Sequence, residues 1–239
     1  MRRVALVTGG ASGIGRACVQ AFGQAEWDVV TVARRTGGAP PGAVAVPGDV
    51  TDPRTSQRAV TAAIEHFGRL DAVVGNAGVT LAKSIDDTRE DELEHLIAVN
   101  VKALVYLAQA AHEALAETRG SFTVMASNKG LVGQRGSPVY VATKGAAVQL
   151  TRALALDWAP EGIRVNALCP GLVDTPMLRS FADAQPDPAE ARRRLAVEQP
   201  LGRLACPEEC AQAALFLASP AASFISGVAL PVDGAFTAQ

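Results

Sequence analysis

The feature that most constrains the fold is an apolar run that leads directly into a glycine-rich turn and a helical stretch. Residues 3–8 are mostly apolar, as expected of a strand buried on both faces, and Gly9, Gly13 and Gly15 follow. Apolar residues then recur at helical spacing as far as residue 25. Glycines let a phosphate approach the backbone closely, and a helix start offers unpaired N–H groups to its charge. The pattern therefore predicts a phosphate-binding turn, the alternative being a tight turn without a ligand.

Strands and helices alternate along the rest of the chain. After the first strand we expect strands at 28–33, 43–46, 70–75, 120–126, 163–168 and 224–231, and helices at 52–67, 88–117, 138–158 and 207–218. Residues 36–42 are rich in turn formers, so we expect no helix between the second and third strands. Such alternation implies right-handed βαβ units and a parallel sheet covered by helices on both faces. We predict an α/β fold with a doubly wound parallel sheet, and one domain over residues 1–239.

Charge, hydropathy and cysteine spacing limit the partners that we expect. The chain has 22 Lys and Arg against 24 Asp and Glu, a net charge of −2, so we expect no nucleic acid and no anionic membrane as partner. No apolar run reaches about 18 residues, so we expect no segment that spans a bilayer. Cys206 and Cys210 lack the spacing of a redox pair or a zinc site, so we expect no metal and free thiols in a reducing cytoplasm.

A Tyr–Lys pair stands near the start of the helix expected at 138–158. Ser137 is a good N-cap and Pro138 a good first helical residue, so Tyr140 and Lys144 fall one turn apart on one face. An ammonium beside a phenol favours the phenolate, and we therefore expect Lys144 to lower the pKa of Tyr140 below its usual value of about 10. The same helix is apolar nearly all round, which predicts cover from a second subunit, as in a homodimer or homotetramer.

Two further features bear on a functional site. Asn100 falls in the middle of the apolar stripe of the helix expected at 88–117. A buried amide must be hydrogen-bonded, so Asn100 is either a core residue satisfied by backbone or a polar group that holds backbone or water near a site. The segment 172–203 follows a strand, contains four prolines and has polar and charged residues throughout. We expect it to form a lid over a substrate.

Short motifs in a fixed order carry a family resemblance. They comprise Thr8, Gly9, Gly13 and Gly15, then Asp49-Val50, Asn76-Ala77-Gly78, Asn100, Ser127, Tyr140, Lys144, Pro170-Gly171 and Thr175. Ser127 precedes Tyr140 by thirteen residues, a separation that is common in the family. Over essentially its whole length the chain resembles the short-chain dehydrogenases/reductases, which implies a Rossmann-type sheet.

The resemblance also implies a reaction and the residues that perform it. Tyr140 would be the general acid/base, and Lys144 would lower its pKa and hydrogen-bond the nicotinamide ribose. Ser127 would hold the substrate oxygen, and Asn100 would anchor a water of a proton relay. The implied function is an NAD(P)(H)-dependent oxidoreductase that interconverts a secondary alcohol and a ketone by hydride transfer.

The cofactor site implied by the resemblance has its pyrophosphate on the glycine turn, its adenine at Asp49 and Val50, and its nicotinamide near Thr175. In full it would comprise Gly9, Ser12, Gly13, Ile14, Gly15, Arg34, Asp49, Val50, Asn76, Ala77, Gly78, Tyr140, Lys144, Pro170, Gly171 and Thr175. An acidic residue ending the second strand would favour NAD, but here Ala33 is followed by Arg34 and Arg35, which could pair with a 2′-phosphate. Family members that use NADP often have a basic residue where Ser12 stands. We expect NADP(H) in preference to NAD(H).

The substrate is less well defined. Runs at 173–176, 199–203, 207–209 and 232–234 resemble members that act on hydroxy acids, sugar-derived acids or acyl thioesters. Arg135 and Arg179 could meet an anionic group, although loop and lid arginines are usually solvated. Two other functions remain open. A non-catalytic NAD(P)-sensing protein could share the fold, but it need not keep all four catalytic residues. A methyltransferase would have no use for the Tyr–Lys pair.

Overall fold

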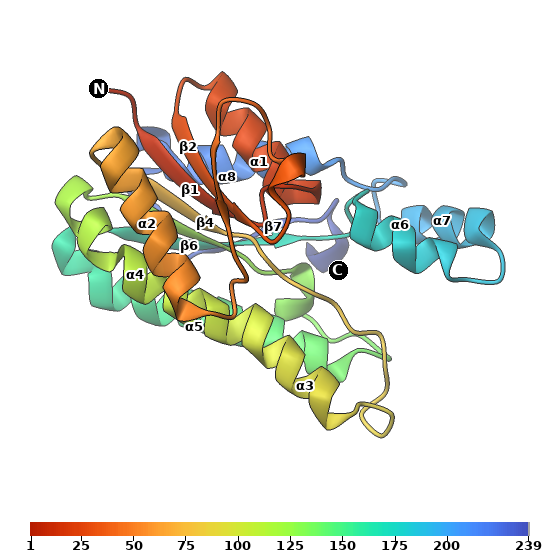
Figure 1. The fold of residues 1–239 in the computed structure, drawn as a ribbon. Helices are drawn as coiled ribbons and strands as arrows, with labels where there is room; N and C mark the ends of the chain where they lie inside the picture. The colour runs from red at the N-terminus through yellow and green to blue at the C-terminus, as the bar shows by residue number, and fades with distance from the viewer. Residues whose placement is uncertain (239) are drawn as a thin grey trace.

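A seven-stranded sheet forms the centre of the molecule in the computed structural model, which describes residues 1–238. All neighbouring strands are parallel, in the order β3-β2-β1-β4-β5-β6-β7 (Figure 1). The strands are β1 Val4–Thr8, β2 Asp28–Ala33, β3 Val44–Pro47, β4 Ala72–Gly75, β5 Ser121–Met125, β6 Arg164–Pro170 and β7 Ala229–Val232. The strand order reverses between β1 and β4, and ligands of such sheets bind beyond the carboxyl ends of the strands at this point.

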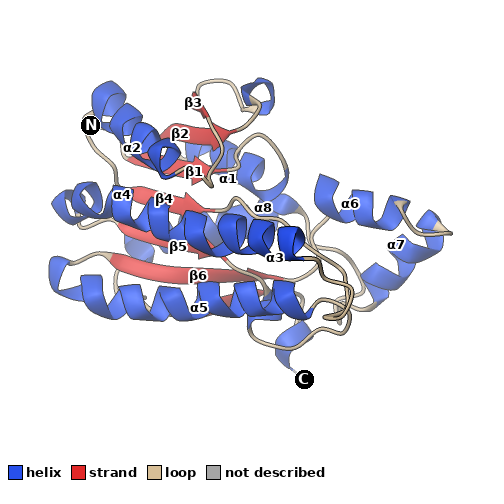
Figure 2. Cartoon of the chain, turned by 60° about the horizontal axis from the view of Figure 1, so that its bottom comes forward, coloured by secondary structure: helices blue, strands red, loops and turns tan. Residues whose placement is uncertain are grey.

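Helices cover both faces of the sheet (Figure 2). They are α1 Gly13–Gln24, α2 Pro53–Phe67, α3 Glu90–Ile97, α4 Ala103–Thr118, α5 Pro138–Trp158, α6 Pro176–Asp183, α7 Pro188–Val197 and α8 Pro207–Ala218. Alternate residues of β1 point to opposite faces, so Val4 and Leu6 pack among α2, α4 and α5, whereas Ala5 and Val7 pack among α1 and α8. This arrangement confirms the predicted doubly wound α/β fold.

Most expected boundaries agree with the structure to within two residues, and β2, α5 and α8 agree fully. The last strand is shorter than expected, since β7 begins only at Ala229. Only a 3-10 turn, Thr36–Gly38, lies between β2 and β3, as predicted. The lid-like segment contains two helices, α6 and α7, which project beyond the carboxyl edge of the sheet (Figure 1). Within residues 1–238 no helix has both the length and the apolar character that a membrane span requires.

The helical segment expected at 88–117 is present, but it is not one uniform α-helix. A π-helical stretch, Ala98–Lys102, separates α3 from α4 and contains Asn100. Short π-helical stretches are frequent at functional sites. The sequence of this segment has a capping-box-like start at Thr88 and Asp91, but the cap lies one residue later, because Arg89 N donates to the Glu92 carboxylate at 3.1 Å. The Thr88 hydroxyl instead donates to Ser84 O at 2.7 Å.

Candidate functional site

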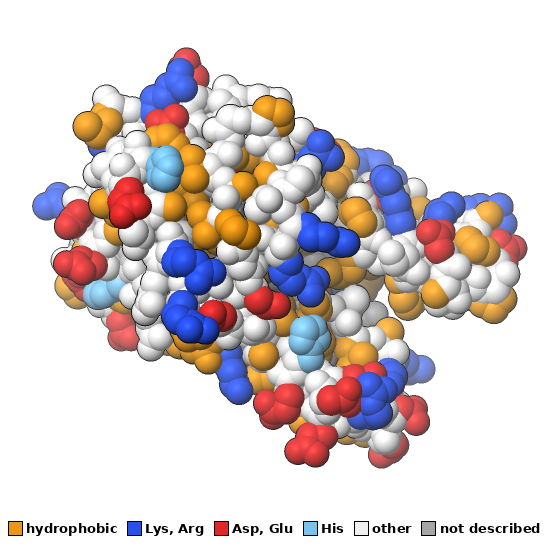
Figure 3. All heavy atoms as spheres, in the orientation of Figure 1, with side chains coloured by type: hydrophobic (Ala, Val, Ile, Leu, Met, Phe, Trp, Pro, Cys, Tyr) orange, Lys and Arg blue, Asp and Glu red, His pale blue; other side chains and the backbone are white. Residues whose placement is uncertain are grey.

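A cavity of about 830 Å³ lies along the carboxyl edge of the sheet, from the glycine turn after β1 to the helices α6 and α7. The space-filling view shows a hollow between the projecting α6–α7 segment and the body of the molecule (Figure 3). Among the predicted site residues, all except Gly15 and Asn100 line this cavity. One continuous space therefore joins the predicted phosphate-binding turn to the predicted catalytic side chains.

The glycine turn is built to leave room and donors for an anion. Gly9 and Gly13 have φ of 72° and 52°, a region that favours glycine. Gly15 has no space for a side chain, since a Cβ there would lie 2.4 Å from both Asn76 Nδ2 and Gly9 O. Ser12 occupies the N-cap of α1 but makes no side-chain cap bond. The first-turn N–H groups of α1 are therefore uncapped by Ser12, and the turn fits a pyrophosphate.

Asn76 joins the ends of two neighbouring strands. Its Nδ2 donates to Thr8 O at 2.8 Å, and the N–H groups of Asn76 and Ala77 donate to Thr8 Oγ1 at 2.9 and 3.0 Å. These bonds tie the end of β4 to the end of β1 at the point where the strand order reverses. Asn76 thereby supports the glycine turn as well as lining the cavity.

Tyr140 and Lys144 lie one turn apart in the first part of α5, as predicted. The Lys144 side chain is buried, its Nζ donates to Met125 O at 3.0 Å, and this nitrogen lies 5.9 Å from the centroid of the Tyr140 ring. Burial lowers the pKa of Lys144 from 10.5 to about 8. Burial also raises the pKa of Tyr140, with the Ser127 hydroxyl opposing part of that rise. The expectation that the pKa of Tyr140 lies below its usual value is therefore wrong for the protein without a ligand, because desolvation of the phenol is the largest effect and only the Ser127 hydroxyl opposes it.

Ser127 lies beyond β5, where it caps a short 3-10 turn. The Ser127 Oγ accepts a hydrogen bond from Lys129 N at 3.1 Å and lies 3.5 Å from Asn128 Oδ1. The residue is buried except for 8% of its surface, which faces the cavity that Tyr140 also lines. On the opposite side of the intervening loop, Ser137 occupies the N-cap of α5 but makes no side-chain cap bond, contrary to its expected role.

Asn100 lies behind the cavity wall. Its amide is hydrogen-bonded to backbone, as in a core residue, and it also holds backbone near the site. Its Oδ1 accepts from Val79 N and its Nδ2 donates to Val79 O, each at 2.9 Å. The same Nδ2 donates to Thr143 Oγ1 at 3.1 Å, and Thr143 Oγ1 donates to Tyr140 O at 2.8 Å. The amide is satisfied largely by backbone, and in this way it fixes Val79, a cavity residue, relative to the turn of α5 that carries Tyr140.

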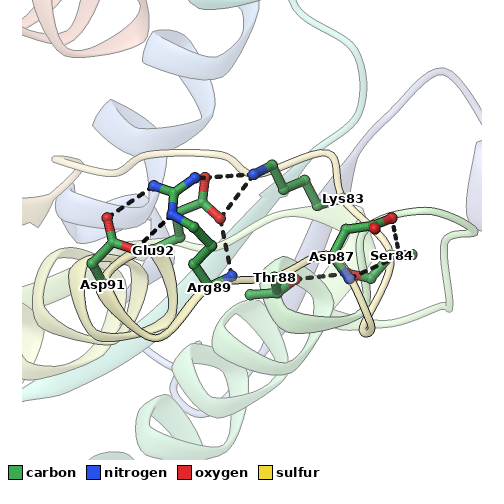
Figure 4. Close-up of polar contacts among 7 residues, drawn as sticks. All are labelled: Lys83, Ser84, Asp87, Thr88, Arg89, Asp91 and Glu92. Atoms are coloured by element: carbon green, nitrogen blue, oxygen red, sulfur yellow. Dashed lines mark hydrogen bonds and ion pairs between the residues drawn. The ribbon is translucent and has the colours of Figure 1, made fainter.

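The loop between β4 and α3 forms one wall of the cavity, and its anchor was not foreseen. Thr80 and Ala82 line the cavity, and beyond them the Glu92 carboxylate accepts from Lys83 Nζ at 2.7 and 2.9 Å and from Arg89 N (Figure 4). The pKa of Glu92 lies below its usual range, chiefly because of the Lys83 bond. The sequence signal for this anchor is an acidic residue three positions after the N-cap of a helix. Counting from Thr88 gives Asp91, whereas counting from the actual N-cap, Arg89, gives Glu92.

The far end of the cavity carries the residues expected near the adenine. Arg34, exposed just after β2, lines it together with Asp49 and His95. Hydrogen bonds from Thr51 N and Oγ1 to Asp49 Oδ1, at 3.0 and 2.8 Å, hold the pKa of Asp49 below its usual range, and the charge of Arg34 contributes less. A basic group therefore stands beside the expected adenine site.

Several cavity residues carry no recognisable motif. They lie mainly in the lid and in the turn after Ser127, and include Lys129, Met177, Phe181, Arg194, Glu198 and Phe236. The two arginines considered for an anionic substrate do not line this cavity. Arg179 pairs with Asp174 at 2.7 and 2.8 Å, and Arg135 is exposed on the loop before α5. Within residues 1–238 no group of three His, Cys, Asp or Glu side chains is placed to hold a metal ion.

Comparisons with known proteins agree with the site. A family model described as enoyl-(acyl carrier protein) reductase matches residues 9–237. The chain is 37% identical to meso-2,3-butanediol dehydrogenase of Serratia marcescens, over 99% of this chain and 95% of that one. It is 38% identical to cis-4-hydroxycyclohexanecarboxylate dehydrogenase of Sinomonas cyclohexanicum, over 99% and 97%. The structure of 3-ketoacyl-(acyl-carrier-protein) reductase from Brucella melitensis complexed with NADH superimposes with a TM-score of 0.91 at 33% identity, over 98% of each chain.

These matches cover nearly the whole chain, and these relatives are named as dehydrogenases or reductases. They give no support to the alternative of a non-catalytic sensor. The chain therefore belongs to the short-chain dehydrogenase/reductase family, as its motifs predict, and is an oxidoreductase that interconverts a secondary alcohol and a ketone with a nicotinamide nucleotide.

Proposed function

We propose that the protein is an NADP(H)-dependent dehydrogenase/reductase in which Ser127, Tyr140 and Lys144 perform the acid–base chemistry and Asn100 positions them. The observation that carries the proposal is the single cavity that these first three side chains share with the glycine turn. A nucleotide whose pyrophosphate lay on that turn would have space to extend to the phenol. The remaining predicted residues, from Ser12 to Thr175, would form the walls around it.

In this proposal the protein supplies proton transfer and orientation. Tyr140, whose pKa is raised by burial, donates a proton to the carbonyl oxygen of a ketone and takes it back from the alcohol. Ser127 donates a hydrogen bond to the same oxygen and stabilises the charge that develops on it. Lys144 places a positive charge below the phenol. When bound, the nicotinamide nucleotide supplies or accepts the hydride.

The preference for NADP(H) rests on the end of β2. Ala33 stands where an acidic residue would bind the 2′-hydroxyl, and Arg34 beside it lines the cavity with Asp49. A guanidinium at this place suits a 2′-phosphate. The Brucella melitensis relative holds NADH, so the choice needs a direct test. Titration of both nucleotides should give tighter binding of NADP(H) than of NAD(H). Arg34→Ala should weaken the binding of NADP(H) and leave that of NAD(H) unchanged. Tighter binding of NAD(H) that is insensitive to Arg34→Ala would contradict this preference.

The substrate that we propose is a small secondary alcohol or its ketone, of the hydroxy-acid, sugar-derived or 3-oxoacyl kind. The relatives' names support this range, since they include a butanediol, a hydroxycyclohexanecarboxylate and a ketoacyl substrate. Residues 172–203, which contain α6 and α7, would act as the lid. Met177 and Phe181 of α6 line the cavity although both are exposed, which suits side chains that close on a substrate.

We also propose that the chain works as one domain in a homodimer or homotetramer in the cytoplasm. The outer face of α5 supports association, because Leu156 is 78% exposed and Ala142 and Ala146 are exposed on the same helix. The four cysteines are free, and a reducing compartment would keep them so.

The experiment that tests the chemistry is a panel of ketones and secondary alcohols followed at the nicotinamide absorbance. Tyr140→Phe keeps the ring and removes the phenolic proton, so kcat should fall at least ~100-fold. Tyr106→Phe, on α4, is the matched control and should leave kcat unchanged, because Tyr106 does not line the cavity. Turnover of a confirmed substrate by Tyr140→Phe at the wild-type rate would refute the proposed mechanism.

A further inference from the structure

Lys129 stands at the reacting end of the cavity without a role in the chemistry described above. It follows Ser127 by two residues, and its backbone N–H donates to Ser127 Oγ at 3.1 Å. The backbone at this position is therefore fixed relative to the hydroxyl that would hold the substrate oxygen. The Lys129 side chain lines the same cavity, beside Phe236 from the end of the chain and Glu198 from the lid.

The ammonium of Lys129 is partly removed from water and lacks a carboxylate partner. Its Nζ lies 3.9 Å from the centroid of the Phe236 ring, and the residue is half-buried. Within residues 1–238 no carboxylate oxygen comes within 4.0 Å of it. Asp233 is near, but its carboxylate accepts from Thr237 N and Oγ1 at 3.1 and 2.8 Å.

The surroundings of this ammonium favour a bound anion. Burial lowers the pKa of Lys129, and the charges of Glu198 and Asp233 offset only part of that decrease. Buried charges in proteins are normally paired, so a half-buried cation that faces a ligand cavity is best satisfied by an anionic ligand. The Phe236 ring contacts the ammonium by a cation–π interaction at the edge of this cavity.

We propose that Lys129 binds a carboxylate of the substrate, so that this enzyme acts on hydroxy acids or oxo acids rather than on neutral alcohols. The inference rests on the proposed function, because it places the reacting carbon at Ser127 and Tyr140. It also separates Lys129 from the two arginines that the sequence offered for an anionic group. Arg179 already pairs with Asp174, and Arg135 lies outside the cavity.

The test compares acids with their amides, which differ in charge and hardly in size. We would measure kcat and KM for 3-hydroxybutyrate and cis-4-hydroxycyclohexanecarboxylate and for the two corresponding amides. The wild-type enzyme should prefer at least one acid over its amide by about tenfold or more in kcat/KM. In Lys129→Gln that preference should fall by about tenfold, because KM for the acid rises. Lys129→Arg, which keeps the positive charge, should retain part of the preference. Arg135→Gln, on the nearby loop, is the matched control and should retain the preference.

Two results would overturn the inference. One is a wild-type enzyme that shows no preference for either acid over its amide. The other is an equal loss on acid and amide in Lys129→Gln, which would show that Lys129 instead supports the lid, through Glu198. If no member of the panel is turned over, the proposed function fails separately. Lys129 is then tested by binding alone, because cyclohexanecarboxylate should raise the melting temperature of the wild-type protein and not that of Lys129→Gln.

Discussion

The ammonium of Lys144 is the most costly charge in the site, and its cost can be worked out from the structure. The residue is 7% exposed, and its Nζ has one hydrogen bond, to Met125 O at 3.0 Å. Burial moves its pKa from 10.5 to about 8. Because one pH unit corresponds to about 1.4 kcal/mol, keeping Lys144 protonated in the folded protein at pH 7 costs about 3 kcal/mol. The lost hydrogen bond with Met125 would offset about 1 kcal/mol of any gain from removing this charge.

Lys144→Met should therefore abolish turnover and raise the free energy of unfolding at pH 7 by about 2 kcal/mol. For a chain of this size that gain corresponds to an increase of roughly 4–8 °C in melting temperature. The effect has a defined pH dependence. Between about pH 8 and 10.5 the unfolded wild-type chain holds a proton that folded Lys144 has lost, so wild-type stability rises with pH through this window. The advantage of the variant should shrink accordingly and be lost by about pH 10.5.

Urea denaturation of both proteins at pH 7 and pH 10.5 measures this difference directly. Lys102→Met is the matched control, because the Lys102 side chain is 49% exposed and should change the stability at either pH by no more than about 0.5 kcal/mol. A Lys144→Met protein that is less stable than wild type at pH 7 would refute the reasoning. So would a gain of the same size at both pH values, since its cause would then not be the charge.

Two further substitutions test the supports of the cavity. Gly15→Ala should cost about 1–3 kcal/mol in urea denaturation and weaken nucleotide binding, because the new Cβ would lie 2.4 Å from Asn76 Nδ2. Gly23→Ala on the same helix, where a Cβ meets nothing within 4 Å, should stabilise by up to about 1 kcal/mol, and equal effects at the two positions would contradict the packing argument. Glu92→Gln should raise KM severalfold and change kcat less, since it loosens the loop that lines the cavity. Asp91→Asn, at an exposed residue of the same turn, should leave KM unchanged. Equal KM values for the two variants would rule out Glu92 as the anchor of this loop.

The sheet and most of the cavity could be predicted from the sequence because both follow from local patterns. Buried parallel strands are continuous apolar runs, and their carboxyl ends share one edge of the sheet. Motif residues placed just after strands, such as Gly9, Asn76 and Ser127, therefore had to converge. The limits of α5 were equally clear, because Pro138 begins it and Pro160 and Gly162 follow it closely.

The parts that sequence reasoning missed depend on contacts between distant segments. The π-helical stretch at Ala98–Lys102 has the apolar stripe of an ordinary helix, and its Asn100 is bonded to Val79 and Thr143, which are distant in the sequence. The pKa of Tyr140 was misjudged for a related reason, since spacing shows which charge is near but not how much water is excluded. Lys129 resembles any loop lysine until Phe236, more than a hundred residues later, is placed beside it.

The two shifted groups also define how the proposed acid–base chemistry depends on pH. Burial raises the pKa of Tyr140 and lowers that of Lys144 to about 8, so each shift disfavours a lone charge. At neutral pH Tyr140 keeps its proton and is ready to donate it, which suits ketone reduction. Alcohol oxidation needs the phenolate, which is stabilised only while Lys144, 5.9 Å from the ring, remains charged. Lys144 loses its proton near pH 8, before Tyr140 does, so oxidation should stop rising above about pH 8, whereas reduction should persist until Tyr140 itself loses its proton at higher pH.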